Sequence, residues 1–137
     1  MTATTVDRAT RLRSGDLLSL AVYGASKIFA GTMAQKNATG YGVKASATIA
    51  NTTLGVAEAQ ADNSSGASGD IRVNVRRNVV GVFGNSASGD AITIADIGAS
   101  CYVVDDQTVA KTDNSGARPV AGKIVDVDTF GVHVLFT

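Results

Sequence analysis

The sequence has no tryptophan, one cysteine and one proline among its 137 residues, with three tyrosines and four phenylalanines. The single cysteine, Cys101, excludes a disulfide within one chain and a zinc site built from several thiolates of that chain. Abundant Ala, Val and Gly with few bulky aromatic side chains indicate thin β-layers rather than a thick core. No apolar run approaches the roughly 18 residues needed to cross a bilayer, and the amino terminus has no apolar signal core. We therefore expect a protein made in a cytoplasm-like compartment, without a membrane partner.

The sequence also has no excess of positive or negative charge, because twelve basic residues balance twelve acidic ones. Such a chain has no overall field that would draw it to nucleic acid or to an anionic membrane. Residues 1–80 hold nine Lys or Arg and five Asp or Glu, whereas residues 81–137 hold three and seven, so the two parts carry +4 and −4. This division predicts attraction within one subunit or between neighbouring subunits; a chance split of solvated charges is the alternative.

Short runs rich in Val and Ile are bounded by Gly, Asn, Ser and Asp, which is typical of antiparallel strands joined by turns. The clearest run alternates Val73 and Val75 with Arg72 and Arg76, a period of two that places one face on a core and the other in water. One turn of helix is expected near Thr93, with Thr93 or Asp96 as its cap and Gly98 at its end. The predicted strands cover residues 17–24, 27–34, 52–61, 71–83, 101–106 and 108–112.

The carboxyl-terminal residues read as a β-hairpin in which KIVDV (123–127) pairs with GVHVLF (131–136). Val132, Val134 and Phe136 share one face of the second strand, and His133 shares the other with Leu135. Pro119 precedes the hairpin, at a strand start where the missing N–H donor does no harm.

One polar signal occurs three times: NSSGASGD at 63–70, NSASGD at 85–90 and SGD at 14–16. Gly adopts positive φ without steric cost, and Asn, Ser and Asp side chains bond to nearby backbone, so this signal reverses a chain ahead of a strand. We interpret the repeat as architecture rather than as a binding motif.

Together these patterns predict a mainly β protein: a single compact barrel or sandwich of short antiparallel strands over residues 17–137, with at most one or two helical turns. Residues 1–16 are polar and Thr-rich without a hydrophobic period, so they are expected to form an extended amino-terminal arm. Such an arm is suited to adding a strand to the sheet edge of a partner.

Candidate chemistry is sparse. A Ser or Cys nucleophile needs a base, and His133 is the one histidine; a hydrolase built on Cys101 and His133 is therefore a further hypothesis, with a structural strand residue as the alternative for His133. The acidic pairs at 105–106 and 126–128 do not match a calcium loop, and the Gly-rich turns match neither a P-loop nor a dinucleotide fingerprint. We expect no enzyme activity, no cofactor and no metal.

Six arginines are the best candidates for contact with another molecule. Aromatic residues are not interleaved with them, so the stacking platform of single-strand binders is missing, and a protein surface is favoured. A small β-barrel that binds nucleic acid or a ligand through an arginine stripe is the alternative. The candidates are Arg8, Arg11 and Arg13 in the arm, with Arg72, Arg76 and Arg77 in the strand region.

Residues 102–112 (YVVDDQTVAKT) and 119–134 (PVAGKIVDVDTFGVHV) resemble the segment that closes the small capsid cement, or head decoration, proteins of tailed bacteriophages. Residues 13–34 and 55–83 are similar to these proteins in order and spacing, so the resemblance covers most of the chain from about residue 8. None of the shared features is chemically diagnostic, because they are strands and turns.

The resemblance implies a structural protein on the outer surface of the virion, which bridges subunits of the major capsid protein and stiffens the shell. It implies self-association, with a homotrimer favoured over a dimer. The arm, including Thr5, becomes the candidate capsid contact. The family supplies no catalytic residue to carry over.

Overall fold

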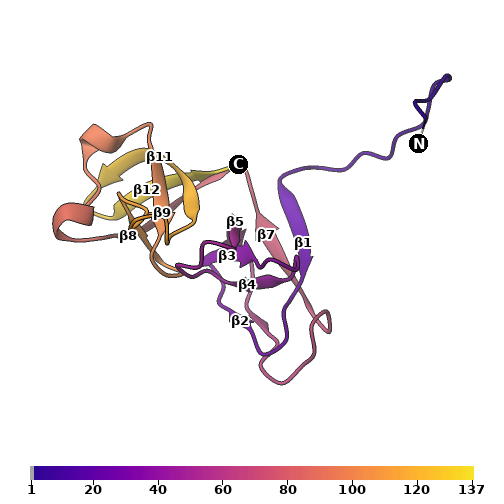
Figure 1. Cartoon of the computed structure of the whole chain (residues 1–137), viewed down its shortest axis with the longest axis horizontal. Coiled ribbons are helices and arrows are strands. Elements are labelled where there is room, and N and C mark those ends of the chain that lie inside the picture. The colour runs from indigo at the N-terminus through magenta and orange to yellow at the C-terminus, as the bar shows by residue number, and fades with distance from the viewer. Residues whose placement is uncertain (1) are drawn as a thin grey trace.

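The computed structural model of the protein describes residues 2–137 and shows an extended arm, a five-stranded sheet and a closed five-stranded barrel (Figure 1). The sheet has the order β1-β7-β5-β3-β4, with β1 (Leu17–Ala21), β7 (Arg72–Arg76), β5 (Thr52–Ala57), β3 (Met33–Lys36) and β4 (Gly42–Lys44). The barrel runs β10-β8-β12-β11-β9, with β10 (Thr108–Ala110), β8 (Val79–Asn85), β12 (Gly131–Phe136), β11 (Val120–Asp128) and β9 (Ser100–Val103). A short pair joins β2 (Lys27–Ile28) to β6 (Ala61–Asp62).

The mainly β prediction is confirmed, and the only helical elements in residues 2–137 are two 3₁₀ turns, η1 (Ser88–Asp90) and η2 (Ile94–Asp96). Thr93 precedes η2 and its N–H donates to Asp96 Oδ2 at 2.8 Å, while Gly98 follows with φ 95°, as the sequence indicated. Residues 2–16 are exposed and contain no strand, in agreement with the predicted arm. Met1, at the start of that arm, lies outside the described residues.

The alternation in β7 is confirmed as well. Val73 and Val75 are buried, and they face the same side as Leu18 and Leu20, to which β1 pairs them in antiparallel register. Arg72 and the other even-numbered residues of β7 lie on the exposed face. Burial of one face is what holds this register, because a slip by one residue would expose both valines.

Three of the predicted strands are interrupted. Residues 71–83 form two strands that belong to different sheets, and the break falls at Asn78, whose φ is 55°. Residues 27–34 turn at Gly31, with φ 78°, which separates β2 from β3. Residues 52–61 divide into β5 and β6. In residues 71–83 the apolar side chains keep odd-numbered positions on both sides of the break, so the period of two does not reveal it.

The barrel closes through a parallel pair, which differs from the expected antiparallel pairing; an isolated bridge between Val22 and Gly42 is also parallel. Thr108 and Val109 of β10 lie beside Gly84 and Asn85 of β8 in parallel register. The β11–β12 hairpin forms as predicted, with Val132, Val134 and Phe136 buried and Pro119 directly before β11. In the barrel core the Phe136 and Phe83 rings meet edge to face, with 5.7 Å between centroids.

The 63–70 turn is held by the side chain of Asn63, which is 2% exposed. Its Nδ2 donates to the carbonyls of Val22, Tyr23 and Ala67 at 3.1, 3.2 and 2.9 Å. Asp70 Oδ2 accepts from the Ala67 N–H at 2.9 Å, which closes the turn ahead of β7. The motif is therefore structural at this position.

The sheet and the barrel have separate hydrophobic clusters that interlock at β3. Met33 packs in the barrel cluster, whereas the next residue, Ala34, packs in the sheet cluster. The Met33 N–H donates to the carbonyl of Asp106 at 2.9 Å, and the carboxylate of Asp106 lies 3.7 Å from Lys44 Nζ. A strand whose two faces serve two cores fixes the barrel against the sheet.

Candidate interaction surface

The arm leaves the body beside the carboxyl end of β7. The Asp16 carbonyl accepts from the Arg77 N–H at 2.7 Å, and Asp16 Oδ1 accepts from Asn78 Nδ2 at 2.8 Å. Beyond this root the arm extends away from both sheets (Figure 1). Two side chains that are apolar, Val6 and Leu12, are 73% and 90% exposed.

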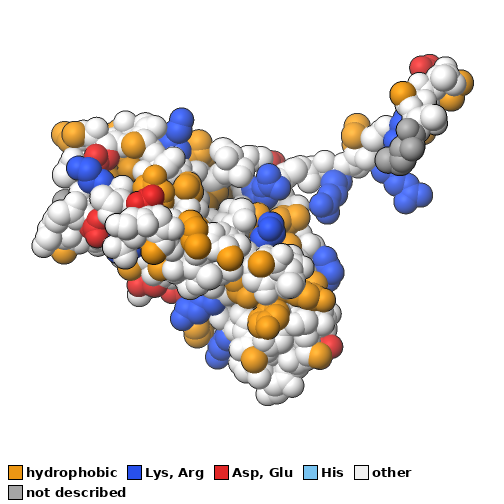
Figure 2. All heavy atoms as spheres, viewed as in Figure 1, with side chains coloured by type: hydrophobic (Ala, Val, Ile, Leu, Met, Phe, Trp, Pro, Cys, Tyr) orange, Lys and Arg blue, Asp and Glu red, His pale blue; other side chains and the backbone are white. Residues whose placement is uncertain are grey.

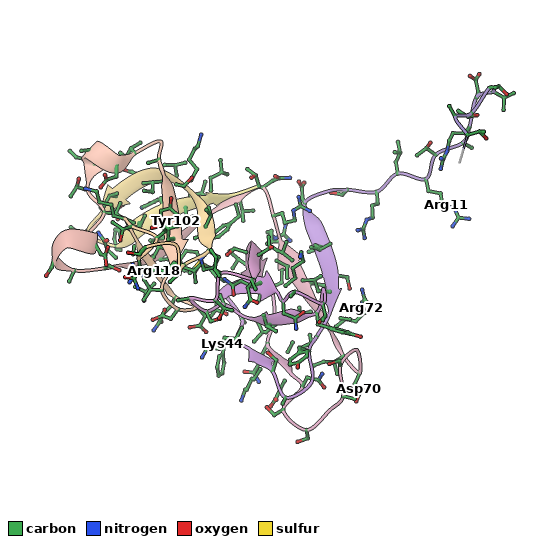
Figure 3. The ribbon with its side chains drawn as sticks, viewed as in Figure 1. Arg11, Lys44, Asp70, Arg72, Tyr102 and Arg118 are labelled. Carbon is green, nitrogen blue, oxygen red and sulfur yellow. The ribbon has the colours of Figure 1, made fainter. Side chains whose placement is uncertain are left out.

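The arm arginines are available for contact. Arg8, Arg11 and Arg13 are exposed, and within residues 2–137 none of them forms an ion pair. The side chain of Arg11 points away from the chain in Figure 3, and basic side chains follow the arm to its root in Figure 2. Thr5 is exposed beside them.

Three arginines lie in β7 or directly after it, and we call them the arginine edge (Arg72, Arg76 and Arg77); their surroundings differ. Arg72 donates from Nε to Ser19 Oγ and from Nη2 to the Ser19 carbonyl, both at 2.9 Å. Arg76 forms an ion pair with Glu58. Arg77 is half-buried, and its Nε is shielded from solvent without a hydrogen-bond partner.

The arm starts beside one end of the arginine edge, at Arg76 and Arg77, whereas Arg72 lies at the other end of β7. Leu17, the first residue of β1, pairs with Arg76, so the arm begins next to the arginine edge. Most acidic side chains visible in Figure 2 lie over the barrel instead. Residues 17–78 carry six Lys or Arg against three Asp or Glu, and residues 79–137 carry three against seven, so the sheet is +3 and the barrel −4.

An aromatic and basic cluster was not predicted from the sequence. The exposed ring of Phe29 has Lys27 Nζ at 5.1 Å and Lys44 Nζ at 5.7 Å from its centroid. The rings of Tyr23 and Tyr41 lie 6.3 Å apart. Phe29 follows β2 and Lys44 ends β4, two strands that lie in contact but far apart in sequence, so no local pattern signals their proximity.

Cys101 and His133 do not meet as a catalytic pair. Cys101 is fully buried inside the barrel, and burial raises the pKa of its thiol to about 11. His133 lies on the other face of β12 from the buried Val132 and Val134, and its Nε2 lies 2.8 Å from Asp128 Oδ2. The barrel wall therefore separates the two groups, and the hydrolase hypothesis lacks its geometry.

Among residues 2–137, Asp126, Asp128 and His133 form a group that could hold a metal ion. Their ligand atoms lie within 4.8 Å of one another because Asp126 is the cross-strand partner of His133. The sequence pattern places the two aspartates in alternation but does not indicate that His133 lies beside them. A hydrogen bond from the Phe130 N–H is the main cause that lowers the pKa of Asp128, and the histidine adds to it.

No family model, curated protein or solved structure matches this chain in the three comparisons with known proteins. Within residues 2–137, none of the helical segments has the length and apolar character required to traverse a lipid bilayer.

Proposed function

We propose that the protein is a structural cement protein of a bacteriophage head, which binds the outer surface of the capsid and bridges subunits of the major capsid protein. The observation that carries the proposal is the exposed arm rooted beside the arginine edge. This arrangement offers an unpaired backbone and several cations on one side of a rigid β-body. Copies on a lattice act together, so individually weak contacts suffice.

The candidate contacts are Thr5, Arg8, Arg11 and Arg13 in the arm and Arg72, Arg76 and Arg77 in the arginine edge. Arginine favours protein interfaces because its planar group forms paired hydrogen bonds with carboxylates. The arm supplies backbone N–H and C=O groups for strand addition. Association into a homotrimer, with a dimer as the alternative, would multiply these contacts at each binding position.

The proposal is tested with expanded shells that lack the protein, assembled from the major capsid protein of the same virus. The purified protein should sediment with the shells and raise their melting temperature. The triple change Arg8→Ala, Arg11→Ala and Arg13→Ala should weaken binding about tenfold or more, since buried charged hydrogen bonds at interfaces cost several-fold affinity each.

A matched control variant also loses three positive charges, but from outside the arm and the arginine edge. It carries Lys36→Ala, Lys111→Ala and Lys123→Ala. This variant should bind within about threefold of the original protein, because a change in net charge alone acts weakly at physiological salt. Failure of the original protein to sediment with the shells would contradict the proposal.

Nucleic-acid binding is the second candidate, favoured by the exposed arginines of the arm and of β7. It predicts DNA affinity that falls steeply as salt rises and is lost when Arg72, Arg76 and Arg77 become Ala. Negligible DNA affinity in both forms at low salt would remove this candidate. Shell binding by a protein that ignores DNA would favour the cement role.

A further inference from the structure

One edge of β5 is only partly paired. β3 pairs with β5 from Thr52 to Val56, but β7 pairs with it only at Val56 and Ala57. Residues 52–54 therefore have no neighbouring strand on the β7 side. β11 passes close to β5 without pairing with it. An unpaired edge of this kind is a template for an added strand.

A groove of about 210 Å³ lies along this edge, between β5 and the start of β11. Its lining includes Leu54, Val120 and Phe136 together with Thr52, Thr53 and Thr137, and Val120 is 49% exposed. An apolar cavity of about 150 Å³ accommodates a benzene molecule, so the groove has room for one leucine side chain. We call the edge of residues 52–54 and this groove the slot.

The arm contains a segment that fits the slot. Leu12 lies between Arg11 and Arg13, and in an extended strand successive side chains point to opposite faces. Leu12 would then face the groove while both arginines face solvent. Leu12 is 90% exposed, which leaves a large apolar side chain without a packing partner in the isolated chain.

We propose that the slot binds the arm of a second copy of this chain, through strand addition at residues 52–54 with Leu12 in the groove. The arm of the same copy is not placed for this role. β7 and the connection at residues 77–78, to which Asp16 is hydrogen-bonded, separate the root of that arm from residues 52–54.

Each copy has one arm and one slot, so the exchange closes a symmetric dimer or a ring such as a trimer. This contact goes beyond the proposed function and does not depend on capsid binding. It uses only the part of the arm around Leu12, and Thr5 and Arg8 remain outside the slot.

The test uses the full chain with Cys101→Ala, so that introduced cysteines are the only thiols. One preparation carries Leu12→Cys and a second carries Thr53→Cys. When the two are mixed and mildly oxidised, a disulfide between them can form only between copies. We expect a covalent dimer that contains one chain from each preparation as the main product. In the control, Val6→Cys replaces Leu12→Cys in the mixture. Over the same time the control should yield at most a tenth as much covalent dimer.

A variant without cysteines tests the same contact in solution. Leu12→Asp should shift the mass measured by light scattering from an oligomer to a monomer, whereas Val6→Asp should leave the oligomer unchanged. Both positions are exposed, so neither change should unfold the body.

A monomeric mass for the original protein at high micromolar concentration would overturn the proposal. It would also be overturned if a chain carrying both Leu12→Cys and Thr53→Cys formed its disulfide within one copy. Neither result bears on shell binding, which is measured separately.

Discussion

Asn63 stabilises its turn as a donor, which leads to a specific expectation. Asn63→Asp keeps the size of the side chain but removes the N–H groups that reach Val22, Tyr23 and Ala67. Because the site is buried, both the unpaired carbonyls and the new charge cost free energy. The free energy of unfolding, measured by urea denaturation, should fall by about 3 kcal/mol. Ser65→Ala in the same exposed turn should change it by less than about 0.5 kcal/mol, and equal effects of the two changes would contradict this account.

This residue also shows what sequence reasoning could reach. Turn chemistry predicts that Asn, Ser, Gly and Asp reverse the chain at 63–70. It does not identify Asn63 as the buried member, because its acceptors at Val22 and Tyr23 lie some 40 positions away along the chain. Likewise, the sequence shows that Asp126 and Asp128 alternate along one strand. It does not show that His133 lies opposite Asp126, because that depends on the register of the hairpin.

β11 depends on close backbone approach at Gly122. A Cβ at this position would lie 2.4 Å from the Leu135 carbonyl oxygen and 2.7 Å from Val134 Cγ1. Gly122→Ala should therefore push β11 from β12 and lower the free energy of unfolding by about 1–3 kcal/mol. Gly89→Ala is the matched control, since a Cβ there meets nothing within 4 Å. Thermal unfolding of both variants measures the difference, and an unaffected Gly122→Ala protein would show that the two strands separate at little cost.

Strands with strong alternation were the elements that sequence predicted best. β7 and β12 each bury one face, and their period of two is visible residue by residue. The parallel β10–β8 pair was missed because it joins residues far apart in sequence, and a three-residue strand has no pattern of its own. The division of 71–83 between two sheets was missed because apolar residues keep odd-numbered positions on both sides of Asn78, so the two strands read as one.

Acid should destabilise the whole molecule. Hydrogen bonds to the carboxylates lower the pKa values of several aspartates, chiefly from the side chain of Thr112 in the case of Asp90 and from the N–H of Phe130 in the case of Asp128. A pKa that is lower in the folded state gives stability that is present above the unfolded value of about 3.9 and is lost as pH falls through the folded value. The aspartates with lowered pKa values are Asp62, Asp90, Asp96 and Asp128.

Urea unfolding at pH 7 and at pH 3 measures this effect, and the midpoint should be clearly lower at pH 3. Asp90→Asn should reduce the difference between the two midpoints, because one of the linked groups no longer titrates. Identical midpoints at the two pH values in the original protein would contradict the assignment.

The architecture as a whole was predicted only in class. Composition and strand pattern led to a mainly β chain with an arm, and that class is confirmed. The open sheet and the closed barrel meet at β3, where Met33 packs into the barrel cluster and Ala34 packs into the sheet cluster. Both residues are small or flexible apolar side chains, so the sequence does not distinguish their destinations.

The junction of the arm with β1 has a mechanical consequence. The arm continues from β1, which is paired with β7 at all five of its positions from Leu17 to Ala21. Hydrogen bonds between antiparallel strands run perpendicular to them. Tension applied along the arm would therefore shear these bonds simultaneously instead of unzipping them in turn, so the body would resist being pulled open from its amino-terminal end.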